Sequence, residues 1–184
     1  NLGTSTTAGY TYVWTPSTGL SSTTTSNPTV TLLNAGTTPI TTTYTLSVTI
    51  TATGCSATDA VVVTVNPLPT ITGVQTVCIG STTQFTGTAT ANATNPYVSS
   101  NPAIATVNAT GLVTGVAAGT ATITYTNSNG CTATRTVTVN PLPVANAGAD
   151  ISVCSNAVSG NLGTSTTAGY TYVWTPSTGL SSTT

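Results

Sequence analysis

The sequence has almost no charge. Among 184 residues the only formal charges are Asp59, Asp150 and Arg135, and the chain contains no histidine, lysine or glutamate. Charged residues make up 2% of the chain, against about 25% in ordinary soluble domains. A net charge of −1 provides no basic surface to attract phosphates or anionic lipids. We therefore expect no nucleic-acid partner.

The same lack excludes most chemistry of active sites and metal sites. General acid–base catalysis needs a positioned titratable pair, and a nucleophilic Ser or Thr needs a base. The four cysteines form no CxxC pair, and there is no histidine to complete a zinc site. Calcium needs several carboxylates, so Asp150 is better interpreted as a turn or cap residue than as a calcium ligand. We predict no enzymatic activity, no cofactor and no metal.

Long apolar runs are missing as well. No segment approaches the roughly 20 apolar residues of a membrane span. No signal peptide is visible, although this says nothing about secretion if the sequence is a window from a longer array.

Threonine, serine and asparagine supply the polarity instead, in patterns typical of β-strands. Residues 43–53 and 120–126 alternate apolar side chains with Thr or Ser, which predicts strands with one buried face and one wet face. Asn, Pro and Gly turn signals separate further short candidates, and no segment has a helical period. We predict an all-β fold of tandem Ig-like β-sandwiches with about seven strands each. The further candidate strands are residues 10–14, 29–33, 61–65, 84–89, 104–107 and 136–140.

The chain repeats itself. Residues 161–184 are identical to residues 1–24, a period of 160 residues, which predicts a window from a tandem array. Within one period, TVNPLP occurs at 64–69 and at 138–143, each after a similar GC-x-A-T run. An odd number of strands and stiff Asn-Pro-Leu-Pro joints predict domains joined end to end as a rod. The predicted domains are the C-terminal part of one sandwich at 1–69, a complete sandwich at 70–143, and the N-terminal part of the next at 144–184.

An even number of cysteines in a β-protein with few charges favours disulfides. Cys78 and Cys131 lie near the two ends of the 70–143 unit, so we predict that they pair. Closing a loop of about 50 residues would stabilise the fold by roughly 4 kcal/mol. Cys154 is expected to pair with the Cys55 of the next repeat, and Cys55 with the Cys154 of the preceding repeat. A direct Cys55–Cys154 bond is the rival arrangement.

Two segments resemble known families. Residues 99–126, SSNPAIATVNATGLVTGVAAGTATITYT, resemble the bacterial Ig-like group 2 domain, with Tyr97 where that family usually carries a tryptophan. Residues 144–156, followed by the pattern of 10–67, resemble the PKD-like repeats of Bacteroidota surface proteins, although the usual Gly-Asp-Gly turn is replaced by residues 15–19. The resemblance implies a giant secreted cell-surface adhesin, extracellular at the bacterial surface and exported by the type IX route.

Individual residues allow a functional and a structural interpretation. Trp14 and its copy Trp174 could stack on a sugar, but a buried core tryptophan is the favoured interpretation, and Tyr97 is expected to anchor the core of the other sandwich. Asp59 and Arg135 occupy equivalent positions in the two GC-x-A-T runs. They could pair neighbouring fibres laterally, but a solvated charge that protects an edge strand is favoured.

These observations lead to three hypotheses about function. The favoured one is a structural repeat of a long extracellular adhesin fibre or stalk, in bacterial surface attachment or gliding motility. Its partners would be neighbouring repeats of the same polypeptide. The second is a module whose Thr-rich faces bind a glycan, another surface or ice. The third is lateral self-association with copies of the same fibre into a filament, which the near-zero charge would not oppose.

Overall fold

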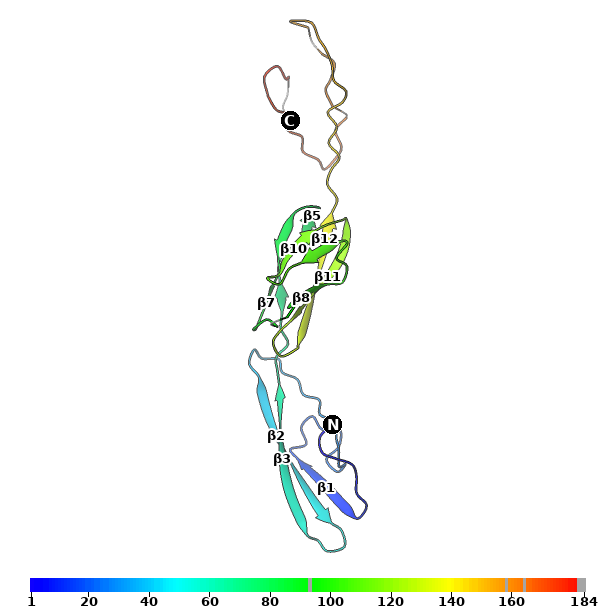
Figure 1. Cartoon of the computed structure of the whole chain (residues 1–184), viewed down its shortest axis with the longest axis vertical. Coiled ribbons are helices and arrows are strands. Elements are labelled where there is room, and N and C mark those ends of the chain that lie inside the picture. Colours follow the sequence, from blue (N-terminus) through cyan, green and yellow to red (C-terminus); the bar gives the residue numbers. More distant parts are fainter. Residues whose placement is uncertain (93, 158, 164, 182–184) are drawn as a thin grey trace. The chain divides into compact units, whose positions relative to one another are not determined.

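The protein consists of β-strands and loops (Figure 1). The computed structural model describes residues 1–92, 94–157, 159–163 and 165–181. In these residues twelve strands form four sheets and there is no helix, which confirms the all-β prediction. Accordingly, this part of the chain has no helix suited to crossing a membrane. By its internal packing the chain divides into two units, Asn1–Pro141 and Leu142–Thr184, and each is described by itself.

The first sheet is a three-stranded antiparallel ribbon of β1 (Tyr10–Thr15), β2 (Ile40–Ile50) and β3 (Ser56–Val65), in the order β1-β2-β3. The alternation of side chains sets its two faces. Trp14 and Tyr44 lie on one face and are 3% and 0% exposed. The opposite face carries mainly Thr and Ser.

The loop between β1 and β2 covers the apolar face of this sheet. The Trp14 indole donates a hydrogen bond to the Thr25 carbonyl at 2.9 Å, and the Tyr44 hydroxyl donates to the Thr18 carbonyl. The strand predicted at 29–33 is wrong, because this segment forms only an isolated bridge between Leu20 and Val30.

Residues 70–141 fold into a sandwich whose main sheet has the order β5-β12-β11-β8 and whose facing sheet has the order β6-β10-β9. A further two-stranded pair joins β4 and β7. The strands are β4 (Ile71–Thr72), β5 (Thr76–Cys78), β6 (Thr82–Gln84), β7 (Thr86–Gly87), β8 (Tyr97–Ser99), β9 (Ala105–Val107), β10 (Leu112–Gly115), β11 (Gly119–Thr126) and β12 (Thr132–Asn140).

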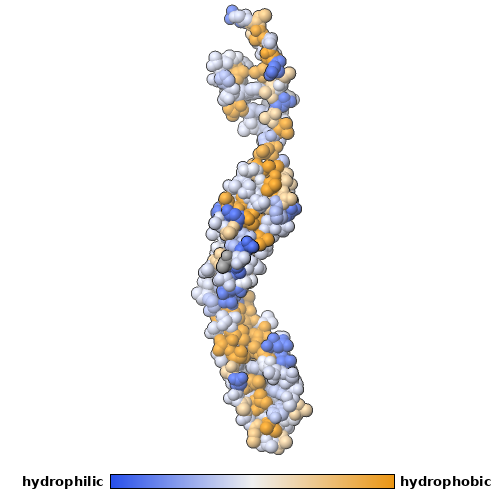
Figure 2. All heavy atoms as spheres, in the orientation of Figure 1, coloured by the Kyte–Doolittle hydropathy of each residue, from blue (hydrophilic) through white to orange (hydrophobic). Residues whose placement is uncertain are grey.

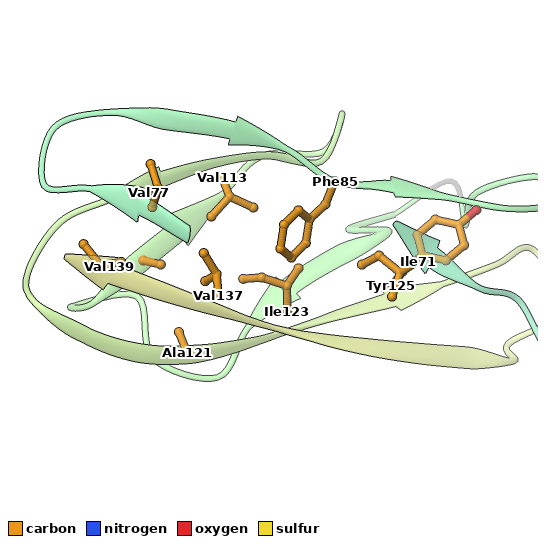
Figure 3. Close-up of a cluster of buried hydrophobic side chains, with 10 residues drawn as sticks. Ile71, Val77, Phe85, Val113, Ala121, Ile123, Tyr125, Val137 and Val139 are labelled. Carbon is orange, nitrogen blue, oxygen red and sulfur yellow. The ribbon is translucent and has the colours of Figure 1, made fainter. Parts of the chain in front are cut away.

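Alternating apolar residues of the two sheets meet in one core (Figure 3). In β11 every second side chain is buried while the threonines between them face outward, as the period of two predicts. The core cluster consists of Ile71, Val77, Phe85, Ala105, Val113, Ala121, Ile123, Tyr125, Val137 and Val139.

This sandwich has more and shorter strands than the seven predicted. The candidate strand at 84–89 is divided at Phe85, because β6 pairs with β10 whereas β7 pairs with β4. One continuous segment thus crosses between sheets. That crossing cannot be seen in a pattern of alternation.

The described residues of the second unit, from Leu142 to Ser181, contain turns and bends but no strand. One backbone hydrogen bond, from the Gly163 N–H to the Ala147 carbonyl at 3.0 Å, joins two of its segments that are 16 residues apart. The predicted boundary between Pro143 and Val144 lies two residues from the division at Pro141.

Candidate functional site

The predicted aromatic anchors occupy three different environments. Trp14 lies under the loop that covers the first sheet, and Leu46 is its cross-strand neighbour. Trp174, its copy, is only half-buried and belongs to no strand. No open face of Trp14 remains on which a sugar could stack, because it is 3% exposed.

Tyr97 is half-buried at the edge of the sandwich core. Its ring lies 4.9 Å from the Tyr125 ring, centroid to centroid, with the planes tilted by 44°. Its hydroxyl accepts a hydrogen bond from the Gly87 N–H at 2.8 Å, and the Tyr125 hydroxyl donates to the Ala89 carbonyl at 2.9 Å. Burial, followed by the nearby Tyr97, raises the pKa of Tyr125 above its usual value. The pair fastens the strand at 97–99 to the core.

The structure contradicts the predicted Cys78–Cys131 disulfide. Cys78 pairs with Asn140 in the β5–β12 ladder, whereas Cys131 precedes the other end of β12. Nine residues of extended chain place them about 30 Å apart, and a disulfide needs Cα atoms within about 7 Å. All four cysteines are free. The two cysteines lie near the two ends of the sequence unit but not near each other in space, because β5 pairs with the C-terminal end of β12 while Cys131 precedes its N-terminal end.

Arg135 is not the solvated charge that the sequence suggested. Its Nε donates to the Gly73 carbonyl at 3.0 Å and its Nη1 to the Ile71 carbonyl at 3.4 Å. Its guanidinium carbon lies 5.9 Å from the centre of the Phe85 ring, within cation–π range. Arg135 therefore fastens the first residues of the sandwich to β12. A side chain with five donors can join two carbonyls that are distant in sequence, and no local signal shows this.

Asp59 remains exposed on the edge strand β3. Its carboxylate accepts a hydrogen bond from the Ala60 N–H at 2.8 Å, and it borders a shallow hollow of about 180 Å³ with Trp14, Leu46 and Val61. Asp150 is also exposed. In the part of the chain that the structure describes, no three His, Cys, Asp or Glu side chains gather where they could hold a metal.

Asn127 is a buried polar residue that the sequence analysis missed. Its side-chain oxygen accepts hydrogen bonds from the N–H groups of Asn129 and Cys131 at 3.0 and 2.9 Å, which shapes the turn between β11 and β12. Its Nδ2 is buried without a protein partner. The Asn129-Gly130 turn signal was visible in the sequence, but the burial of Asn127 was not.

The outer face of the β11–β12 hairpin carries a ladder of threonines. Four cross-strand pairs lie directly opposite one another: Thr120 with Thr138, Thr122 with Thr136, Thr124 with Thr134, and Thr126 with Thr132. Successive pairs repeat about every 6.8 Å along the strands. This regular array of hydroxyl and methyl groups is a candidate contact surface, and we call it the threonine ladder.

The second candidate surface is the free edge of β3. β3 is an outer strand of its sheet, so half of its backbone N–H and C=O groups point away from β2. Val61 and Val62 are 37% and 60% exposed on it. Figure 2 shows hydrophobic residues gathered over the β2–β3 part of the molecule. We call residues 61–66 the β3 edge.

Comparisons with known proteins find similar solved structures. The chain is 23% identical to the C-terminal 282-residue fragment of intimin, solved in complex with the intimin-binding domain of the translocated intimin receptor. That match covers 74% of this chain and 54% of the fragment, with a TM-score of 0.46. Domains 1–6 of the surface layer protein SbsC match at 22% identity over 79% of this chain and 22% of theirs, with a TM-score of 0.31. The chain thus spans about half the length of the intimin fragment. No curated protein matches.

One family model matches as well. Its span, from Val62 to Val139, takes in the end of β3 and almost all of the sandwich, somewhat less than half of the chain. This part of the chain matches the bacterial Ig-like domain (group 2).

Proposed function

We propose that this chain is a structural segment of a long extracellular fibre or stalk through which a bacterium attaches to surfaces or glides. The observation that carries the proposal is the path of the chain through the sandwich. Thr70 pairs with Thr88 next to the β11–β12 turn, whereas Asn140 ends β12 at the other end, about 27 Å away. A domain whose two ends lie opposite one another can be strung in series and can transmit load along the chain.

Three further features support this function. The 160-residue period supplies successive copies. The match to a bacterial Ig-like domain is consistent with a module used in series. With two acids and one base in the whole chain, such a surface would respond little to salt or pH outside the cell. The sequence resemblance to PKD-like repeats extends this proposal to giant Bacteroidota adhesins such as the gliding-motility adhesin SprB.

The experiment is live imaging of intact source cells labelled with an antibody raised against this chain. Label on the surface is expected, and label that travels along the cell would support a gliding adhesin. Static label would support a passive stalk. Label that appears only after permeabilisation would refute the surface location.

The threonine ladder favours a second candidate function, binding to a glycan, another surface or ice. Flat, regular hydroxyl arrays could match a repeating surface, whereas β-propensity alone would also enrich threonine. We would measure glycan-array and ice-affinity binding of the chain and of a Thr122→Lys/Thr136→Lys variant. Binding that this variant loses, and that a Thr11→Lys/Thr49→Lys control on the other sheet retains, would establish the second function. If the unaltered chain binds neither glycans nor ice, the second function is excluded and the stalk function remains the proposal.

A further inference from the structure

We propose that the β3 edge is completed by residues 152–154 of a second copy of this chain, which add a parallel strand to it. This goes beyond the stalk function, because it names a contact surface, its occupant and the register between them.

The template for this contact lies within the chain itself. In the sandwich, β5 pairs in parallel with the end of β12: Thr76 opposite Thr138, Val77 opposite Val139, and Cys78 opposite Asn140. Two flanking hydrogen bonds continue the ladder, from the Thr138 N–H to the Gln75 carbonyl at 2.7 Å and from the Ile79 N–H to the Asn140 carbonyl at 3.1 Å.

Both strands of this template have a second version in the sequence. The end of β12 and the residues after it read TVNPLP at 138–143, and the end of β3 reads TVNPLP at 64–69. β5 reads Thr-Val-Cys at 76–78, and residues 152–154 read Ser-Val-Cys. Each three-residue segment comes after an Asn-Pro-Leu-Pro joint, by six residues in the first case and eight in the second.

The two versions differ in whether the two segments are paired in the structure. Val77 and Val139 are 7% and 2% exposed. Val153 is 56% exposed in a segment without strand structure, and Val65 is half-buried at the outer edge of its sheet. The β3 edge therefore offers the acceptor, and residues 152–154 offer the donor, of a pairing that the sandwich already makes.

The template sets the register residue by residue. Ser152 pairs with Thr64, Val153 with Val65, and Cys154 with Asn66. The Thr64 N–H then donates to the Ile151 carbonyl, as the Thr138 N–H donates to Gln75. In a continuous array, the same segment of the preceding repeat would fill this edge within one polypeptide. When the partner is a separate molecule, residues 152–154 of one copy pair with the β3 edge of the next, head to tail.

This register also replaces the predicted pairing of Cys154 with the Cys55 of another repeat. Cys154 would lie beside Asn66, eleven residues along the extended strand from Cys55, and therefore about 35 Å from it. The distance is as prohibitive as that between Cys78 and Cys131.

A cysteine trap tests the register. Asn66→Cys, in a chain whose Cys55, Cys78 and Cys131 are changed to Ser, leaves one thiol at position 66 and one at Cys154. Oxidised glutathione accepts the two electrons and two protons as the bond forms. We expect a ladder of covalent dimers and larger multimers on a non-reducing gel that increases with protein concentration and collapses on reduction, with the 66–154 link confirmed by mass spectrometry.

Two matched variants make the result decisive. Asn140→Cys, in a chain that keeps only Cys78, places two thiols opposite each other in the template register and should form an intrachain bond. Thr64→Cys in place of Asn66→Cys moves the thiol two residues out of register and should reduce multimers at least fivefold. If the Asn140→Cys control closes while the Asn66→Cys chain stays monomeric, or closes on itself within one chain, the proposal is overturned. Surface labelling of cells is independent of this result, so the stalk function can fail or hold separately.

Discussion

Residues 1–21 and 161–181 have the same sequence, but the residues that the structure describes in the two copies adopt different structures. In the first copy, residues 10–15 form β1 and pair with β2; in the second, residues 170–175 form no strand. Trp14 is 3% exposed and Trp174 is half-buried, and the exposure of valine rises from 49% at Val13 to 78% at Val173. The two copies differ in their partners among the described residues, because β1 of the first copy pairs with β2 and residues 170–175 of the second copy pair with no strand.

The local conformations nevertheless agree. The Thr7 N–H donates to the Tyr12 hydroxyl oxygen at 2.9 Å, and the Thr167 N–H donates to that of Tyr172 at the same distance. Both copies contain a turn closed by a leucine N–H, that of Leu20 in one and that of Leu180 in the other. Turns within a few residues therefore form without the sheet, while the strand and the burial of the tryptophan depend on a partner more than 25 residues away.

Giving the second copy a strand equivalent to β2 should produce the largest change in the difference between the two copies. Adding residues 25–69 after Thr184 should let the second copy form its own three-stranded sheet and bury Trp174 as deeply as Trp14. In a Trp14→Phe background, the fluorescence of Trp174 should move to the shorter wavelength of a buried tryptophan. The same extension with the counterpart of Tyr44 changed to Ala serves as the control. An unchanged spectrum for the intact extension would contradict the dependence on β2.

Weakening the partner strand of the first copy should have an effect nearly as large. Tyr44 is fully buried and hydrogen-bonds the loop over Trp14, so Tyr44→Ala should destabilise the first sheet by about 3–5 kcal/mol. Denaturant unfolding followed by Trp14 fluorescence, in a Trp174→Phe background, measures it. Thr43→Ala, on the exposed face, should cost less than about 0.5 kcal/mol. Equal losses from both changes would show that burial at Tyr44 is not what holds this sheet.

The same glycine substitution should have unequal effects in the two copies. Gly3 and Gly163 both have positive φ angles, 69° and 76°, and both lie against a tryptophan. A Cβ at Gly3 would overlap the Ser26 carbonyl oxygen, so Gly3→Ala should cost the first sheet about 1–3 kcal/mol. Gly163→Ala should leave the unfolding midpoint seen by Trp14 unchanged, because no sheet depends on it. A matching loss from Gly163→Ala would indicate that the second copy is more ordered than its lack of strands implies.

The smallest effect concerns tyrosine ionisation. The hydrogen bond from Thr167 lowers the pKa of Tyr172, whereas burial raises the pKa of Tyr125. Absorbance titration of Tyr172→Phe and Tyr125→Phe variants should show that Tyr172 ionises at a lower pH than Tyr125. The neutral form of Tyr125 is favoured by folding, so its contribution to stability is complete below pH of about 10 and is lost as the pH rises through the raised folded value. Denaturant midpoints that fall already between pH 7 and 9 would disagree with this assignment.

Much of the fold was accessible from alternation alone. The period of two at 120–126 predicted β11 and its buried face, and the turn signals separated most strands correctly. The strand predicted at 43–53 is shifted by three residues toward the C-terminus relative to β2, because the hairpin turn already begins at Thr51. The short strands β4, β5, β8 and β10 were missed, since two to four residues are too few to establish a period.

The sites were less predictable than the fold. Arg135 appeared to be an isolated edge charge, but it joins two carbonyls and a phenylalanine ring brought from 50 to 64 residues away. Cys78 and Cys131 seemed well placed to pair, but the parallel β5–β12 ladder holds them at opposite ends. In both cases the outcome depends on which strands pair, and the sequence pattern does not show that pairing.

By itself the sequence determined the repeat, the all-β class, the nearly uncharged surface and the local turns that both 21-residue copies share. These features depend on composition and on contacts within a few residues, which form wherever the same local sequence occurs. Tertiary structure alone decided which strands pair, which tryptophan is buried and which cysteines can meet. A strand satisfies only part of its hydrogen bonds and buries only one face without a neighbour, so its structure belongs to the pair and not to the segment.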